Sequence, residues 1–246
     1  MSELTIYAAL RTAGMTAAGA CGLMGNMARE SVMHSNNLQD SYNSLFKLTD
    51  EQYTTLVDAG KATYNGKTFA NDQAGYGLCQ WTHPDRKSKL LAFAKAECAS
   101  IADEAMQVRY AIHELQTDFP AVWKILCSTH SVSEAADVVC RRYEMPAVNN
   151  VEARTDSARA FLNKFAGVDY SLVDLETEAP VSAPDTDLYD FAARLTPETM
   201  MHLQVVLLAL GYKIGTQAVA NGIDGYNGRK CAAATKDLAE KLYALL

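Results

Sequence analysis

The chain of 246 residues has no long hydrophobic run and no surplus of basic residues. No apolar stretch reaches the roughly 18 to 20 residues that a membrane-spanning helix requires, so we expect no membrane anchoring. The 29 Asp and Glu residues outnumber the 22 Lys and Arg residues, which gives a formal net charge of −7. No basic patch marks a nucleic-acid-binding surface, so we expect no nucleic-acid partner.

The chain also lacks the cysteine spacing of a metal site. None of its six cysteines forms a CxxC pair, and no Cys/His cluster has zinc-ligand spacing, so no metal and no cofactor is expected. Most of these cysteines lie in apolar helical patterns, where a reduced thiol packs as a small hydrophobe. Cys79 differs because it lies in a candidate site segment, and a thiol peptidase using Cys79 is one alternative function. No histidine and Asp or Asn partners can be identified for it.

Residues 169–190 differ in composition from the rest of the chain. They carry seven acidic residues and no Lys or Arg, with Pro180 and Pro184 among Ser and Ala. Such a segment predicts an extended, solvated linker. It divides the chain into a first domain at 1–168 and a small C-terminal unit at 191–246.

The first domain has the apolar periodicity of helices. The capping-box patterns Thr49…Gln52 and Ser131…Glu134 predict helix starts. The only segment that favours a β-hairpin is 60–82, which is rich in Gly, Asn, Thr and Tyr. We therefore predict a mainly α fold, an α+β domain with one small β-hairpin. The expected helices lie at 3–18, 20–33, 84–98, 100–116, 119–129, 131–143 and 151–166.

A single acid, Glu30, stands at the end of an apolar helical pattern. Cleaving a glycosidic bond requires an acid that holds its proton near neutral pH, and burial among apolar groups raises the pKa of a carboxyl. We therefore expect Glu30 to act as a general acid and Ser31 to orient it. The alternatives are a surface glutamate and a simple polar helix end. The apolar neighbours of Glu30 are Cys21, Leu23, Met24, Met27, Val32 and Met33.

The second candidate segment is the glycine-rich turn Gly75-Tyr76-Gly77-Leu78-Cys79-Gln80-Trp81-Thr82. Its glycines permit a tight turn and close approach of a ligand to the backbone. Tyr76 and Trp81 offer flat faces for a sugar ring, and Gln80 offers a donor and an acceptor for N-acetyl groups. The alternative is that the aromatic rings fill the core.

Together the two segments resemble the signature of phage tail-tip lysozymes and, more distantly, of goose-type lysozymes and lytic transglycosylases. The later stretch Tyr143-Glu144-Met145-Pro146, with Arg154 and Ala158, is similar to that family's later helices. An aromatic-Glu-Arg-Pro step is common there, and Met145 replaces the arginine. The resemblance covers roughly residues 12–166. It implies a lysozyme-like domain that cleaves peptidoglycan.

The sequence leaves the second carboxylate open. Retaining and inverting glycosidases both need one near the acid, whereas lytic transglycosylases use a single glutamate and form an anhydro ring. Asp72 is the best candidate, although an Asx-type turn after Asn71 is a structural alternative. The further candidates are Asp40, Asp50 and Asp58.

The C-terminal unit resembles a three-helix peptidoglycan-binding module. The similarity lies in Leu203-Gln204, Leu210-Gly211-Tyr212 and Ile223-Asp224-Gly225-Tyr226, although the usual Phe-Gln of the last helix is absent. The resemblance implies that Asp224 and Tyr226 contribute to cell-wall binding. Two wall-directed units on one chain would support each other, because tethering raises the effective concentration at an insoluble substrate.

The resulting expectation is a phage or prophage endolysin. It would cleave the β-1,4 bond between N-acetylmuramic acid and N-acetylglucosamine in peptidoglycan. The start of the chain lacks the basic region of a signal peptide. We therefore expect synthesis in the host cytoplasm and release to the wall through a holin-type pore. The alternatives are a lytic transglycosylase, a tail-associated lysin, and a non-catalytic wall-binding or virion structural protein.

Overall fold

A computed structural model describes residues 2–172, and all structural statements below concern these residues. Most of the predicted linker and the whole unit at 191–246, including Asp224 and Tyr226, lie outside the described residues. The elements are α1 (Glu3–Thr12), α2 (Ala17–Ser31), α3 (Asp40–Phe46), α4 (Asp50–Asp58), α5 (Pro84–Ala96), α6 (Glu104–Thr117), α7 (Pro120–Leu126), α8 (Val132–Val139), the π-helix η1 (Cys140–Glu144), α9 (Val151–Lys164) and the 3-10 helix η2 (Tyr170–Leu172).

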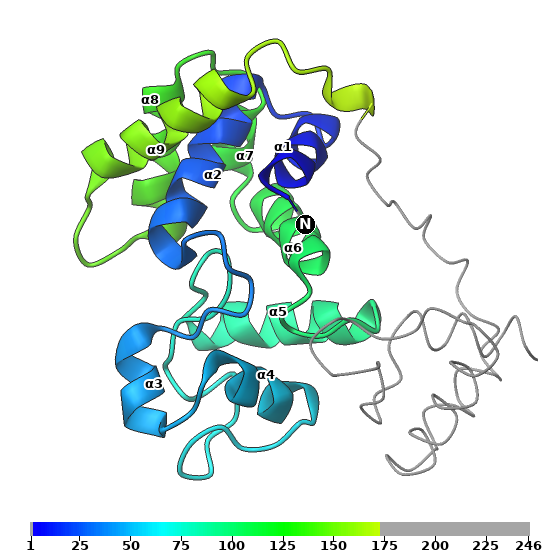
Figure 1. Ribbon diagram of the computed structural model, residues 1–246, viewed down its shortest axis with the longest axis vertical. Helices are drawn as coiled ribbons and strands as arrows, with labels where there is room; N and C mark the ends of the chain where they lie inside the picture. Colours follow the sequence, from blue (N-terminus) through cyan, green and yellow to red (C-terminus); the bar gives the residue numbers. More distant parts are fainter. Residues whose placement is uncertain (1, 173–246) are drawn as a thin grey trace, which may run out of the picture.

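Helix α2 is the central helix of the larger part of the domain. It packs against α1, α7, α8 and α9, and α6 lies on the same side of the molecule (Figure 1). Helices α3 and α4 form the opposite part with the segment between α4 and α5, and α5 runs between the two parts (Figure 1). The carboxyl end of α2 points toward α3, so residues at this end lie where the two parts meet.

Two glycines allow the neighbours of α2 to approach it closely. A Cβ atom at Gly22 would lie 2.4 Å from the Cβ of Ala135 on α8. A Cβ atom at Gly25 would lie 2.6 Å from the carbonyl oxygen of Arg154 on α9. Any larger residue would push these helices outward. The glycine spacing of α2 therefore determines how close α9 lies to the end of α2.

The smaller part of the domain is built around aromatic rings. Phe46 stacks on Tyr64 with ring centroids 4.6 Å apart, and Tyr53 lies 5.4 Å from Tyr76. Phe69 contacts the ring of Tyr76 edge-on. Offset and edge-on ring pairs stabilise a core beyond their buried area. This cluster holds the 60–82 segment in place without a regular sheet.

The helices agree largely with those predicted, and the chain is mainly α as expected. The capping box of Thr49 and Gln52 is present, and Ser131 caps α8. The first predicted helix is shorter than expected, because Gly14 adopts φ 110° just after it. Helix α3 was not predicted from the sequence. No helix in the described part is long and apolar enough to cross a membrane.

The predicted β-hairpin is reduced to isolated bridges. Tyr64 pairs with Lys67 around a tight turn, and Tyr76 pairs with Trp81. A third bridge joins Tyr76 to Leu38, which precedes α3. The start of the predicted linker also differs from the expectation, because η2 packs against α1. There the guanidinium of Arg11 lies 4.6 Å from the ring centroid of Tyr170.

Candidate active site

The two candidate segments are joined directly by Ser31. This serine is the last residue of α2 and is buried, and its hydroxyl lies 3.1 Å from the carbonyl oxygens of both Met27 and Leu78. The hydroxyl thereby connects the end of α2 to the glycine-rich turn. The structure gives Ser31 a contact with the turn, and no hydrogen bond to Glu30 is present.

The residues that follow α2 complete this junction. The amide of Gly77 donates to the carbonyl of Asn37 at 2.9 Å, and the amide of Gln39 donates to the carbonyl of Gly75 at 2.9 Å. These two hydrogen bonds pair residues 37–39 with residues 75–77 in the manner of two neighbouring strands. The segment that starts at Gly75 is therefore held beside the chain leaving α2. The two segments that the sequence singled out therefore belong to one site.

Gly77 is required for the geometry of this turn. Its φ of 75° lies in the left-handed region, and a Cβ atom there would lie 2.5 Å from Oε1 of Gln107. Gln107 is buried on α6, and its side chain accepts a hydrogen bond from the amide of Leu78 at 2.9 Å. The sequence did not single out Gln107, because an amide inside a helical pattern has no distinguishing signal.

Glu30 forms an ion pair with Arg154. Its Oε1 lies 2.5 Å from Nη2 of Arg154, whose side chain is buried on α9. A second nitrogen of Arg154 donates to Oδ1 of Asn26 at 2.9 Å, and Asn26 is itself anchored to the carbonyls of Gly22 and Ala136. The surroundings of Glu30 are therefore not purely apolar, contrary to the expectation from its sequence neighbours.

A second carboxyl, Glu144, lies near enough to Glu30 for the charge of Glu30 to act on it. It is the last residue of η1, and its Oε1 is buried without a hydrogen-bond partner. Burial, reinforced by the negative charge of Glu30, raises the pKa of Glu144 to about 8. In the sequence, Glu144 stands out only through the family resemblance of the stretch around it. The signal for it was the aromatic-Glu step before Met145 and Pro146.

Both carboxyl-bearing helices end in strained residues. Val32, just beyond α2, has φ 52°, and Met145, just beyond η1, has φ 49°. Left-handed backbone is costly for a residue with a side chain, especially a β-branched one. Both side chains are exposed, at 72% and 59%.

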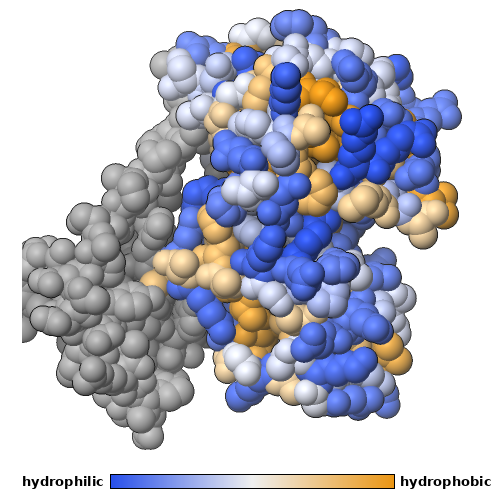
Figure 2. All heavy atoms as spheres, turned by 180° about the vertical axis from the view of Figure 1, so that it is seen from behind, coloured by the Kyte–Doolittle hydropathy of each residue, from blue (hydrophilic) through white to orange (hydrophobic). Residues whose placement is uncertain are grey.

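Figure 2, which shows the molecule from behind, places apolar side chains in separate patches on a mostly polar surface.

Glu114 anchors the residues that precede the second carboxyl. It accepts two hydrogen bonds from Arg86, at 2.7 and 2.8 Å, and one from the hydroxyl of Tyr143 at 2.7 Å. It also accepts a hydrogen bond from the indole of Trp81 at 3.0 Å. Burial opposes ionisation, but the bonds from Arg86 hold the pKa of Glu114 below its usual value. Glu114 therefore ties Trp81, α5 and η1 together.

The geometry of Asp72 argues against the role of second carboxylate predicted for it. Its side chain is fully buried and lies 2.5 Å from Nζ of Lys87, which is also fully buried. It accepts further hydrogen bonds from Tyr53, Thr63 and the amide of Ala74. A buried carboxylate that accepts this many hydrogen bonds has a structural role, which is to stabilise the fold. Asp50 and Asp58 likewise accept hydrogen bonds from backbone amides.

The aromatic residues of the turn are part of the core. Tyr76 and Trp81 are fully buried, and the hydroxyl of Tyr76 lies 2.6 Å from that of Thr54. Neither ring presents a face to a sugar in this structure, so the core-filling alternative describes them better. Gln80 is only half-buried. Its amide nitrogen is engaged within the protein, because it lies 2.7 Å from Oδ1 of Asn37 and 3.2 Å from the carbonyl oxygen of Gly77, which holds the side chain against the chain leaving α2.

Cys79 does not have the surroundings of a nucleophile. It is buried, and burial raises the pKa of its thiol well above the usual value. A thiolate is the reactive form of cysteine, so a raised pKa disfavours attack. In the described residues, no group of three or more His, Cys, Asp or Glu side chains is arranged to hold a metal ion.

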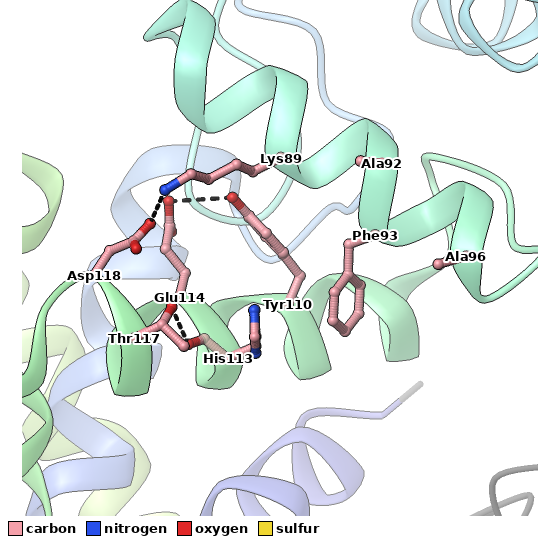
Figure 3. Close-up of a pocket in the computed structure, with 9 residues that line it drawn as sticks. All are labelled: Lys89, Ala92, Phe93, Ala96, Tyr110, His113, Glu114, Thr117 and Asp118. Atoms are coloured by element: carbon pink, nitrogen blue, oxygen red, sulfur yellow. Dashed lines mark hydrogen bonds and ion pairs between the residues drawn. The ribbon is translucent and has the colours of Figure 1, made fainter.

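A shallow pocket of about 500 Å³ lies elsewhere, between α5 and α6. Figure 3 shows Phe93 and Ala92 on α5 facing Tyr110 and His113 on α6. Its charged groups are already paired, because Lys89 lies 2.6 Å from Asp118. None of the residues predicted for the site lines this pocket. We therefore place the candidate active site at the junction of α2, the glycine-rich turn, η1 and α9.

Comparison with known proteins shows the family of the described domain. The family model of the phage tail lysozyme matches residues 2–165, which is most of the described domain. No curated protein matches the chain. The matched family implies a lysozyme-like, peptidoglycan-cleaving domain with a glycosidase or lytic transglycosylase type of activity. The chain belongs to the phage tail lysozyme family.

Proposed function

We propose that the chain cleaves the β-1,4 bond between N-acetylmuramic acid and N-acetylglucosamine, with the carboxyl of Glu30 as the general acid. The observation that carries this proposal is the position of Glu30. Glu30 precedes Ser31, the last residue of the central helix, which contacts the glycine-rich turn, and the carboxyl of Glu30 lies 2.5 Å from a buried arginine. Such a position orients one carboxyl between the two parts of the domain, as attack on a polysaccharide bond requires.

The residues around Glu30 have distinct parts in this proposal. Arg154 and Asn26 fix the direction of the carboxyl, and Ser31 holds the turn against α2. Oε1 of Gln80 accepts a hydrogen bond from the amide of an N-acetyl group of the sugar. Glu30 protonates the leaving oxygen. The proposal requires no metal or cofactor.

Muropeptide mass spectrometry is the test of the bond that is cut. Purified peptidoglycan is digested with the full chain, and the released fragments are analysed. Reducing N-acetylmuramic acid ends indicate hydrolysis, and anhydro ends indicate transglycosylation; both place the cut at the proposed bond. Reducing N-acetylglucosamine ends, or cleaved peptide stems with intact glycan, would contradict the proposal.

For the biological role we propose an endolysin that reaches the wall through a holin-type pore. A second candidate, a tail-associated lysin, is favoured by the name of the matched family, phage tail lysozyme. Proteomic analysis of purified virions separates them. Absence from virions, with lysis delayed when the pore-forming protein is removed, supports the endolysin. Stoichiometric presence in virions identifies the tail-associated lysin.

For the C-terminal unit at 191–246 we propose a role in wall binding. The support is the sequence resemblance around Asp224 and Tyr226. Full-length protein carrying Asp224→Ala and Tyr226→Ala should co-sediment less with insoluble peptidoglycan. Its release of fragments from soluble glycan should be unchanged, because the proposed reacting residues lie in the first domain. Undiminished sedimentation would remove this role from Asp224 and Tyr226.

A further inference from the structure

The chain just after Glu30 carries a valine in a conformation that valine disfavours. Val32 has φ 52° and ψ 34°, in the left-handed region, and it follows the last residue of α2. A branched Cβ makes this conformation costly, and helices that end in it usually have glycine or asparagine there. Among the described residues, Val32 is the only β-branched residue with a positive φ.

Hydrogen bonds on both sides of this valine impose its conformation. Before it, the hydroxyl of Ser31 lies 3.1 Å from the carbonyl oxygen of Leu78. After it, the amide of His34 donates to the carbonyl of Ser31 at 2.9 Å. The hydroxyl of Ser35 then donates to the carbonyl of Ala102 at 2.8 Å. Strained backbone persists where its surroundings fix it in this way, and such residues gather at ligand-binding sites.

The side chain of Val32 contributes little to the packing of the fold, because it is 72% exposed. The next residue, Met33, has φ 62° but is partly buried and packs against the hydrophobic core. Packing therefore offsets the strain at Met33. Val32 has no such compensation, since an exposed side chain buries little apolar surface. A valine that strains the backbone without stabilising the folded chain indicates a contact outside the fold.

The position of Val32 identifies the molecule that it contacts. It lies two residues after Glu30, so the two Cα atoms are at most about 7 Å apart. Both residues lie at the end of α2 that points toward α3 (Figure 1). A sugar bound with its glycosidic oxygen at Glu30 is therefore within reach of Val32. The methyl groups of a peptidoglycan glycan belong to the N-acetyl and lactyl substituents of its sugars.

We propose that Val32 is a specificity-determining residue that binds a methyl-bearing substituent of an amino sugar next to the cleaved bond. This inference rests on the proposed function. Contact between the methyl and the valine removes both from water, and an exposed side chain gains most from such a contact. The fixed left-handed backbone presents the side chain before the substrate arrives, which lowers the cost of ordering on binding.

The first test separates binding from turnover, with full-length protein acting on soluble, peptide-free glycan strands. Val32→Ala removes two methyl groups but keeps Cβ, and Val32→Gly also frees the backbone. Both should raise KM about tenfold with kcat nearly unchanged, as expected when a uniform binding contact is lost. A tenfold change equals about 1.4 kcal/mol, which is the size expected for two buried carbons. Val32→Ile keeps a branched apolar side chain and should keep the wild-type KM.

Val148→Ala is the matched control, because Val148 is 78% exposed and lies between η1 and α9. It should leave KM unchanged. Thermal melts complete the comparison, since Val32→Gly should melt at a higher temperature than wild type and yet bind the glycan more weakly. A purely structural role does not produce that combination. An unchanged KM in Val32→Ala, or an equal rise in Val148→Ala, would overturn the inference.

A competition experiment distinguishes the two methyl-bearing substituents. Chitin oligosaccharides lack the lactyl group, and de-N-acetylated glycan strands lack the acetyl group. Both are measured as inhibitors of cleavage of intact strands. If Val32 contacts the acetyl methyl, Val32→Ala should weaken inhibition by chitin oligosaccharides about tenfold and leave inhibition by de-N-acetylated strands unchanged. Contact with the lactyl methyl should give the reverse.

Equal effects of Val32→Ala on both inhibitors, or no effect on either, would overturn the assignment of a methyl contact. A folded wild-type protein that cleaves no peptidoglycan would reject the proposed function and this inference with it. In an active protein, a KM that Val32→Ala leaves unchanged would reject the inference alone.

Discussion

The carboxylate of Glu30 at the end of α2 lies 2.5 Å from the guanidinium of Arg154 on α9. The contact depends on how closely these helices pack, and that packing depends on Gly25. A glycine on one helix thus positions the side chain of another helix against the predicted catalytic acid. The site is therefore sensitive to substitutions that never touch a substrate.

Gly25→Ala should lower both stability and activity. The added methyl would meet the carbonyl oxygen of Arg154 at 2.6 Å and displace α9. We expect a loss of about 1 to 3 kcal/mol in the free energy of unfolding, which is typical of overpacking. Turnover per folded molecule should also fall, because Arg154 moves relative to Glu30. Denaturant melts and muropeptide release measure the two effects.

Gly19→Ala is the control for this substitution. Its methyl would clash with the backbone of Leu126 at the end of α7 and not with α9. Stability should fall, but turnover per folded molecule should be retained. Equal losses of turnover in both variants would show that α9 has no special part in orienting Glu30.

Val32→Gly should stabilise the protein. Val32 has φ 52° and is 72% exposed, so glycine relieves the left-handed strain and removes little packing. The gain should be about 1 kcal/mol, since the relieved strain exceeds the entropic cost of glycine. Val148→Gly, at another exposed valine, should not stabilise. Thermal melts compare the two, and an unchanged or lower midpoint for Val32→Gly would show that the position stores no strain.

Asp72→Asn should destabilise the fold without changing the chemistry. Removing the carboxylate leaves the ammonium of Lys87 buried without its charge partner. Breaking a buried pair in this way costs about 3 to 5 kcal/mol. Urea unfolding measures this loss, and activity per folded molecule should remain. If the variant is stable but inactive, Asp72 is the second carboxylate after all.

Stability should depend on pH through Glu144. Its pKa is raised from 4.5 to about 8 in the folded state, so the folded chain binds this proton more tightly than the unfolded chain. Stability from this group is present at low pH and is lost as pH rises from about 4.5 to about 8. The maximum slope is about 1.4 kcal/mol per pH unit. Glu144→Gln should reduce this slope in urea unfolding, whereas Glu152→Gln should not.

The sequence allowed prediction of the helices and of the acid at the end of α2, because both depend on local apolar periodicity and capping. It also singled out the glycine-rich turn, since paired glycines around aromatic residues are a local signal. The burial of Tyr76 and Trp81 could not be predicted in this way. An aromatic ring in a turn can face a ligand or the core, and only the packing of Phe69 and Glu114 around these rings decides between them.

The ion-pair partners of the carboxylates could not be predicted from the sequence either. Asp72 is paired with Lys87, and Glu30 with Arg154, across separations that no helical or strand period connects. Glu144 lies at the end of the π-helix η1, and the effect of the charge of Glu30 on it likewise has no local signal. These are tertiary relationships, so the sequence could indicate the acid but not the charges around it.

The activity of Glu30→Gln is the most direct test of Glu30 as the general acid. Glutamine keeps the shape of the side chain and removes the acid, so clearing of purified walls should slow by about 10²- to 10⁴-fold. The thermal midpoint should fall, because Arg154 loses its charge partner, so clearing is compared per folded molecule. Clearing at the wild-type rate by a folded Glu30→Gln protein would contradict the assignment of Glu30 as the catalytic acid.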